Sequence, residues 1–79
     1  MRRVRLYHAA GCSLCDRARD VLLRVREEEP FELEEVDITG VPELERRYRE
    51  WLPVVEIDGE QAFVYRVDEA EFRHRLNQI

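Results

Sequence analysis

Two cysteines, Cys12 and Cys15, are the residues of this chain best suited to chemistry, and no other cysteine is present. Two thiols separated by two residues can close a small disulfide ring, ligate a soft metal ion, or pack as small apolar side chains. A structural zinc site usually takes four protein ligands, and the only further soft ligands are His8 and His74. The spacing therefore favours reversible dithiol–disulfide chemistry, with metal binding and core packing as the alternatives.

The residues around the pair predict that Cys12 is the reactive thiol. A short apolar strand over residues 3–8 is followed by apolar residues at helical spacing over residues 13–28. Cys12 then stands at a helix N-terminus, where unpaired backbone N–H groups and the helix dipole stabilise a thiolate. We expect its pKa to lie below the ordinary value of about 8.5, with Asp16 as a weaker opposing charge. Cys15 points toward the core one turn later, so Cys12 would attack and Cys15 would resolve.

After the first helix, the pattern predicts a strand over residues 31–38, in which the apolar alternation slips by one residue near Glu35. A second helix is expected to follow, capped by Thr39 or Gly40 and with Pro42 in its first turn. The side chains expected to face inward from this helix are those of Leu44, Tyr48 and Trp51.

The last third of the chain predicts a hairpin and a third helix. Strands over residues 53–57 and 61–65 are joined by Asp58-Gly59, which suits a type I′ turn because both central residues need positive φ. Asp68 followed by Glu71 forms a capping box at the start of the final helix. The apolar residues of that helix are Ala70, Phe72 and Leu76.

The resulting order, β-α-β-α-β-β-α, predicts an α/β domain with a four-stranded mixed sheet and three helices. The first strand, helix and second strand form a right-handed parallel unit. The closing hairpin must join the same sheet, with helices covering both faces. The loop after the first strand then lies at the carboxyl edge of the sheet, and this edge carries Cys12 and Cys15.

Length and charge limit the classes of function. The 79 residues predict one small domain over residues 1–79, near the lower limit for a fold supported by a single apolar core. A formal net charge of −5 argues against general affinity for nucleic acid or for an anionic membrane. No apolar stretch reaches membrane-spanning length, and the N-terminal apolar run is too short for a signal peptide. We therefore expect a cytoplasmic monomer, a setting in which a close cysteine pair is more often catalytic or metal-binding than structural.

Three features together resemble glutaredoxins and their small thioredoxin-fold relatives. They are the segment LYHAAGCSLCDRA over residues 6–18, the Leu52-Pro53 step, and the Asp58-Gly59 hairpin, and the likeness covers nearly the whole chain. The resemblance implies a thioredoxin-like fold, with Cys12 as nucleophile, Cys15 as resolving thiol and Pro53 as a cis-proline beside the disulfide. A cis bond there would expose the backbone of Leu52, which can pair with an incoming substrate as a strand would.

The chain also departs from that family pattern. Glutaredoxins commonly have a Lys shortly before the cysteines, where this chain has His8-Ala9-Ala10, and often Pro-Tyr between them, where it has Ser13-Leu14. Their Gly-Gly pair after the hairpin is replaced by the segment Phe63–Val67. Asp68 matches the family's Asp that meets the γ-glutamyl end of glutathione, and its position as a helix cap explains it equally well.

The resemblance implies a dithiol thiol–disulfide oxidoreductase, which would act on small or protein disulfides in electron transfer and redox homeostasis. The alternatives are a metal or iron–sulfur module and a redox-responsive adaptor that uses the same pair. We expect no bound cofactor and slow reduction by glutathione, because only Arg49 or Arg66 could supply a cation and Phe63 and Val64 would fill the space of the glycines. A flavin-dependent reductase of the thioredoxin type is the expected faster partner.

Overall fold

The chain folds in the predicted order, and the computed structural model describes residues 1–78 of it. The strands are β1 (Arg3–His8), β2 (Glu32–Asp37), β3 (Val54–Ile57) and β4 (Glu60–Val64). The helices are α1 (Ser13–Glu28), α2 (Pro42–Tyr48) and α3 (Glu69–Leu76), with a 3₁₀ turn, η1 (Arg49–Trp51), directly after α2. Over residues 1–78, no helix is both long and apolar enough to cross a membrane.

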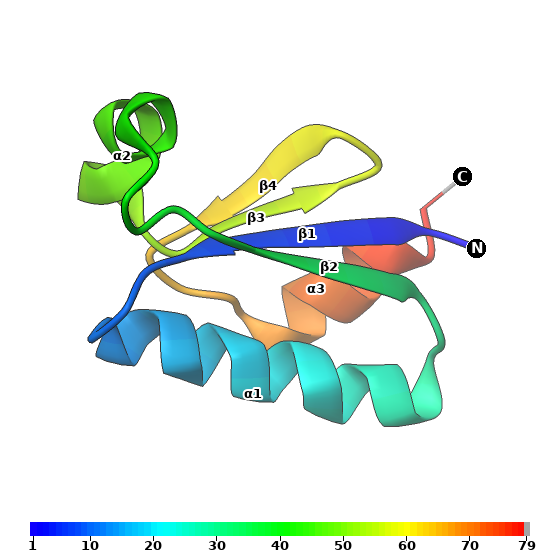
Figure 1. Ribbon diagram of the computed structural model, residues 1–79. Helices are drawn as coiled ribbons and strands as arrows, with labels where there is room; N and C mark the ends of the chain where they lie inside the picture. The colour runs from blue at the N-terminus through cyan, green and yellow to red at the C-terminus, as the bar shows by residue number, and fades with distance from the viewer. Residues whose placement is uncertain (79) are drawn as a thin grey trace.

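The four strands form one mixed sheet in the order β2-β1-β3-β4. β1 pairs with β2 in parallel and with β3 antiparallel, and β4 continues the sheet antiparallel to β3. Helices α1 and α3 lie against one face, and α2 lies on the other face near one end of the sheet (Figure 1). The loop from β1 into α1 lies at this same end, so the cysteines are at the carboxyl end of β1 as predicted.

Apolar side chains pack against both faces of the sheet. The first core lies between the sheet and helices α1 and α3, and its buried members are Val4, Leu6, Ala18, Leu22, Val25, Phe31, Val55, Ile57, Phe72 and Leu76. The second core lies near α2 and the cysteine loop, and consists of Tyr7, Ala9, Cys15, Ile38, Tyr48, Leu52 and Val54. Alternate residues of β1 therefore supply both cores, with Tyr7 stacked on Tyr48 at 4.1 Å between ring centroids.

The slip in the apolar alternation near Glu35 does not interrupt β2. The register between β1 and β2 is continuous over residues 32–37. Leu33 packs against the first core and Val36 against the second, so the change of parity near Glu35 reflects a strand that contributes to both faces.

The predicted caps of α2 are wrong, although Pro42 is in its first turn. Val41 is the N-cap residue and makes no side-chain capping bond. The Thr39 hydroxyl instead accepts a hydrogen bond from the backbone N–H of Ala10 at 3.1 Å. Gly40 has φ +79 and donates its N–H to a carboxylate oxygen of Glu45 at 3.1 Å. The residues expected to cap α2 therefore serve the preceding turn.

Of the remaining local predictions, all but the one for Trp51 are confirmed. Leu44 and Tyr48 of α2 pack inward as expected, whereas the Trp51 side chain is 49% exposed. Asp58 and Gly59 both have positive φ, which confirms the hairpin geometry. Each predicted strand end lies within one residue of the observed end.

Candidate active site

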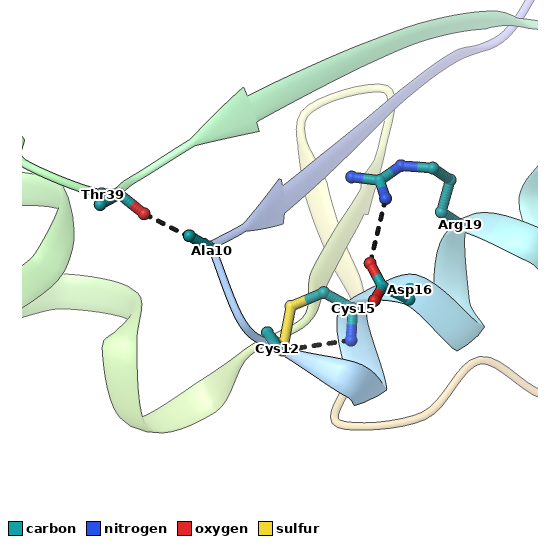
Figure 2. Close-up of a disulfide and its surroundings, with 6 residues drawn as sticks. All are labelled: Ala10, Cys12, Cys15, Asp16, Arg19 and Thr39. Carbon is teal, nitrogen blue, oxygen red and sulfur yellow. Dashed lines mark hydrogen bonds and ion pairs between the residues drawn. A yellow bond between two sulfur atoms is a disulfide. The ribbon is translucent and has the colours of Figure 1, made fainter.

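Cys12 is the N-cap residue of α1 and forms a disulfide with Cys15, with their Cα atoms 5.2 Å apart (Figure 2). Its backbone is extended, with φ −97 and ψ 102, before the first helical residue. The backbone N–H of Cys15 donates a hydrogen bond to Cys12 Sγ at 3.1 Å. This N–H belongs to the first turn of the helix, which has no intrahelical acceptor for it, so the sulfur of Cys12 takes the place of a capping oxygen.

The two sulfurs differ in exposure. Cys15 is 1% exposed and belongs to the second core, together with Tyr7 and Ile38. Cys12 is only partly buried and packs against the edge of that core. An incoming sulfur would therefore meet Cys12 first.

The cysteine loop is attached to the end of β2. The hydrogen bond from Ala10 to Thr39 joins the two segments (Figure 2). The backbone N–H of Thr39 also donates to Asp37 Oδ1 at 2.9 Å. That second bond lowers the pKa of the Asp37 carboxyl below its usual value. Gly11, with φ +73, makes the turn from the loop into the helix. Cys12 is thus positioned by β2 as well as by α1.

The negative charge nearest the pair in sequence is compensated. Asp16 in the first turn of α1 accepts a hydrogen bond from Arg19 Nη1 at 3.2 Å (Figure 2). The Nε of Arg19 also pairs with Glu35 of β2, and this bond is the main reason that the pKa of Arg19 is raised. Arg19 therefore offsets the charge that sequence reasoning placed in opposition to a thiolate at Cys12.

The structure brings Leu52 and Pro53 to the cysteine end of the sheet. Their peptide bond is cis, as predicted, and both residues are buried. Leu52 belongs to the same core as Cys15. The carbonyl of Pro53 accepts a hydrogen bond from the backbone N–H of Tyr65 at 3.0 Å, which attaches the segment after β4 to the start of β3. Pairing of Leu52 with a substrate backbone stays a prediction.

Asp68 is a helix cap in this structure. Its exposed side chain accepts a hydrogen bond from the backbone N–H of Glu71 at 2.9 Å, Oδ1 being the acceptor atom. No hydrogen bond or ion pair within residues 1–78 joins it to the cysteine loop. A contact with substrate at Asp68 stays a prediction.

The side chains expected to hinder glutathione are placed differently from the prediction. The ring of Phe63 packs against Phe72 at 6.2 Å between centroids, and Val64 packs against the second core. Both point into the protein, because β4 has a core on each side. Arg49 forms an ion pair with Glu45 of its own helical segment at 2.9 Å.

A groove that sequence reasoning missed lies beside the cysteine pair. This side groove encloses about 250 Å³ and is lined by Leu14, Arg17, Ala18 and Val21 of α1 and by Tyr65, Arg66 and Val67 after β4. The spacing of the α1 residues marks one face of a helix, a signal visible in the sequence. The segment packed opposite that face is set by tertiary structure, and no local pattern indicates it.

A larger hollow of about 700 Å³ lies over β1, β2 and the turn between β3 and β4. The charged residues lining it neutralise one another or a neighbour, through the pairs Arg3–Glu32, Arg5–Glu34, Arg5–Glu56 and Arg2–Asp58. None of its lining residues comes from the cysteine loop, so it is separate from the candidate site.

The histidines do not complete a metal site with the pair. His8 is partly buried at the end of β1, and His74 is exposed on α3. Among residues 1–78, no three His, Cys, Asp or Glu side chains lie close enough together to hold a metal ion.

Comparison with known proteins agrees with this geometry. The uncharacterized protein Rv0508 of Mycobacterium tuberculosis is 34% identical over 79 residues, covering 94% of this chain and 77% of that protein. The X-ray structure of protein XcR50 from X. campestris superposes with a TM-score of 0.79 at 26% identity, covering 94% of this chain and 95% of the other. A mutant thioredoxin from Halobacterium salinarum gives a TM-score of 0.68 at 19% identity, covering 94% of this chain and 70% of the thioredoxin.

The family comparison covers almost the entire chain. The model of the family described as glutaredoxin-like domain (DUF836) matches residues 3–77, which include the cysteine loop, the cis-proline and all four strands. The chain therefore belongs to this glutaredoxin-like family and has the thioredoxin-like fold.

Proposed function

We propose that the protein is a dithiol thiol–disulfide oxidoreductase in which Cys12 attacks and Cys15 resolves. The observation that carries this proposal is the disulfide at the N-terminus of α1, in which the more exposed sulfur accepts the N–H of Cys15. That N–H and the positive end of the helix dipole are available to stabilise a thiolate once the disulfide is reduced. Membership of a glutaredoxin-like family supports the same chemistry.

The proposed reaction transfers two electrons from the dithiol to a substrate disulfide. The Cys12 thiolate attacks one substrate sulfur, forms a mixed disulfide, and releases the other substrate sulfur as a thiolate that takes up a proton. Cys15 then loses its proton and attacks Cys12 Sγ, which releases the second substrate thiol and closes the Cys12–Cys15 disulfide. A dithiol or a flavin-dependent reductase returns two electrons and two protons to the protein.

Substitution of each cysteine tests this assignment. Cys12→Ser is expected to abolish reduction of a disulfide substrate, because the attacking sulfur is lost. Cys15→Ser is expected to accumulate a mixed disulfide with the substrate, detected as an added mass that dithiothreitol removes. Ser13→Ala, which changes an exposed residue between the two cysteines, is the matched control and should retain turnover.

Two outcomes would contradict the assignment. Turnover by Cys12→Ser would show that Cys12 is not the attacking thiol. A mixed disulfide formed by Cys12→Ser and not by Cys15→Ser would show that the roles of the two cysteines are exchanged. Visible absorption or stoichiometric zinc in protein purified without reducing agent would favour the use of the pair as metal ligands. The setting we propose is the cytoplasm, where a reduced pair is maintained and can donate electrons.

A further inference from the structure

Two arginines line the side groove without an acidic partner. Arg17 of α1 and Arg66 after β4 are exposed and form no ion pair within residues 1–78. Most of the other arginines are paired with carboxylates, namely Arg2, Arg3, Arg5, Arg19, Arg24, Arg49 and Arg73. The chain has 18 acidic residues for 13 basic ones, so its overall charge is negative. Two unpaired arginines on one groove make that groove locally positive.

The side groove adjoins the redox pair. Leu14, which stands between the two cysteines, is one of its lining residues, and Val21 and Val67 add further partly buried apolar surface. A ligand in the groove would therefore contact both apolar side chains and the two arginines. Its sulfur would lie at the cysteine end.

The loop that presents Arg66 is held in place. Tyr65 has φ +68, a backbone conformation that residues other than Gly, Asn and Asp seldom adopt. Its hydroxyl donates to the carbonyl of Glu50 at 3.0 Å, and its ring lies 6.0 Å from that of Trp51 between centroids. With the bond from its N–H to Pro53, these contacts fix the loop beside the cis-proline.

We propose that the side groove binds an extended segment of a protein substrate, with an acidic side chain next to the reacting cysteine held between Arg17 and Arg66. This inference rests on the oxidoreductase function proposed above. A guanidinium group recognises a carboxylate by paired hydrogen bonds, so two of them select for an acidic residue at this place.

The occupant is a protein segment because the surface continues beyond the groove. The exposed rings of Trp51 and Tyr65, 49% and 43% accessible, form a pair at the Tyr65 side of the groove. Exposed aromatic side chains are enriched in protein–protein interfaces, and a peptide chain can contact both the arginines and this pair. The net charge of −5 opposes acidic partners in general, so the preference depends on the two arginines alone.

The test compares two disulfide-linked peptide dimers that differ only in carrying Glu or Gln beside the cysteine. The reduced protein is mixed with each dimer in a single turnover, and the released peptide thiol is separated and measured. Each rate is divided by the rate of the same dimer with dithiothreitol, which removes the intrinsic effect of the charge on the disulfide. We expect the Glu dimer to react about fivefold faster than the Gln dimer at low ionic strength, with a smaller ratio in high salt.

Variants assign the preference to the groove. The double variant Arg17→Gln/Arg66→Gln should bring the ratio close to one, with folding confirmed by its thermal transition. Arg46→Gln removes another exposed arginine, from α2, that has no acidic partner within residues 1–78, and it should keep the wild-type ratio.

A Glu-to-Gln ratio near one in the wild type, or a ratio that the double variant leaves unchanged, overturns the inference. In both cases the release of peptide thiol from the dimers still upholds the oxidoreductase function. Absence of exchange with both dimers rejects that function and the inference with it. If glutathione disulfide reacts as fast as the Glu dimer and with the same dependence on the two arginines, the occupant is a small tripeptide and the assignment to a protein segment is wrong.

Discussion

At the scale of single residues, the reactivity of Cys12 depends on the backbone N–H groups and the charges around its sulfur, which together decide how well a thiolate is stabilised. The N–H of Cys15 points at Cys12 Sγ, and the helix dipole adds to its effect. Asp16 is the nearest opposing charge in the sequence, and Arg19 is bonded to it. Because Arg19 is also bonded to Glu35, its position depends on β2 and not on the helix alone.

The first prediction concerns the pKa of Cys12 in the reduced protein. We expect the rate of alkylation by iodoacetamide in Cys15→Ser to rise with a midpoint below about 8.5, the ordinary value for cysteine. Arg19→Gln should raise this midpoint by at most about half a unit, because Asp16 is exposed and its charge is screened. Arg24→Gln, which removes an arginine more than two turns along α1 from the cysteines, should leave it unchanged. A wild-type midpoint at or above about 8.5 would show that the helix N-terminus does not activate the thiol.

At the scale of elements, the attachment of α3 to α1 depends on charge as well as on the first core. Three consecutive glutamates end α1, where the helix dipole disfavours negative charge. Arg73 of α3 contacts two of them, Glu28 and Glu29, at 2.5 and 3.0 Å, and also Glu69 at 3.2 Å. One arginine thus joins the end of α1 to α3.

The second prediction is that this arginine stabilises the fold in a pH-dependent way. Hydrogen bonds from Asn77 and Arg73 lower the pKa of Glu29, and hydrogen bonds from Arg24 and Arg73 lower that of Glu69. A carboxyl whose pKa is lower in the folded state contributes stability above its unfolded pKa, and this contribution is lost as the pH falls through the folded value. Arg73→Gln should therefore lower the melting temperature by a few degrees at pH 7. The difference should shrink as the pH falls below about 4.5, the ordinary glutamate value.

Arg46→Gln is the control, since Arg46 has no acidic partner within residues 1–78. Its melting temperature should follow that of the wild type across the same pH range. An equal loss of stability in Arg73→Gln at pH 7 and at pH 3 would show that the arginine acts through packing and not through its charge.

The third prediction separates two roles of Asp68. Asp68→Ala should reduce the free energy of unfolding by about 1 kcal/mol, the usual cost of losing an N-cap side chain, measured by urea titration. Asp68→Asn should retain most of the stability, because Asn caps a helix as well as Asp does. A fall in the rate of exchange with glutathione disulfide in Asp68→Asn, normalised to dithiothreitol, would assign the carboxylate to the substrate as well. An Asp68→Ala variant as stable as the wild type would contradict the capping role.

The elements were predictable where local chemistry decides them. Asp58-Gly59 turns the chain by its own φ preferences, and Cys12 is a helix N-terminus because the apolar period begins just after it. The prediction that Thr39 caps α2 failed because the Thr39 hydroxyl bonds to Ala10, a residue remote in sequence. The side groove was not predictable for the same reason, since Arg17 and Arg66 come to line one groove only through the tertiary fold.

At the scale of the whole molecule, the side groove places two arginines that form no ion pair within residues 1–78 beside the cysteine loop. Ala9 and Ala10 stand where glutaredoxins commonly carry a lysine, and Ala9 is buried. Arg49 is bonded to Glu45, and a contact between Arg49 and a substrate stays a prediction. The open face of the sheet bears charges that pair among themselves.

The last prediction concerns the electron donor. Glutathione is a small anionic tripeptide whose binding needs cations for two carboxylates and close approach to the backbone. The groove offers Arg17 and Arg66, but the exposed Tyr65 also lines it, and the net charge of −5 adds a long-range penalty. We therefore expect slow reduction of the Cys12–Cys15 disulfide by glutathione and faster reduction by a flavin-dependent reductase of the thioredoxin type. Parallel NADPH-coupled assays, one with glutathione and glutathione reductase and one with thioredoxin reductase, measure both rates. Efficient turnover with glutathione alone would mean that the two arginines suffice for the tripeptide despite Tyr65.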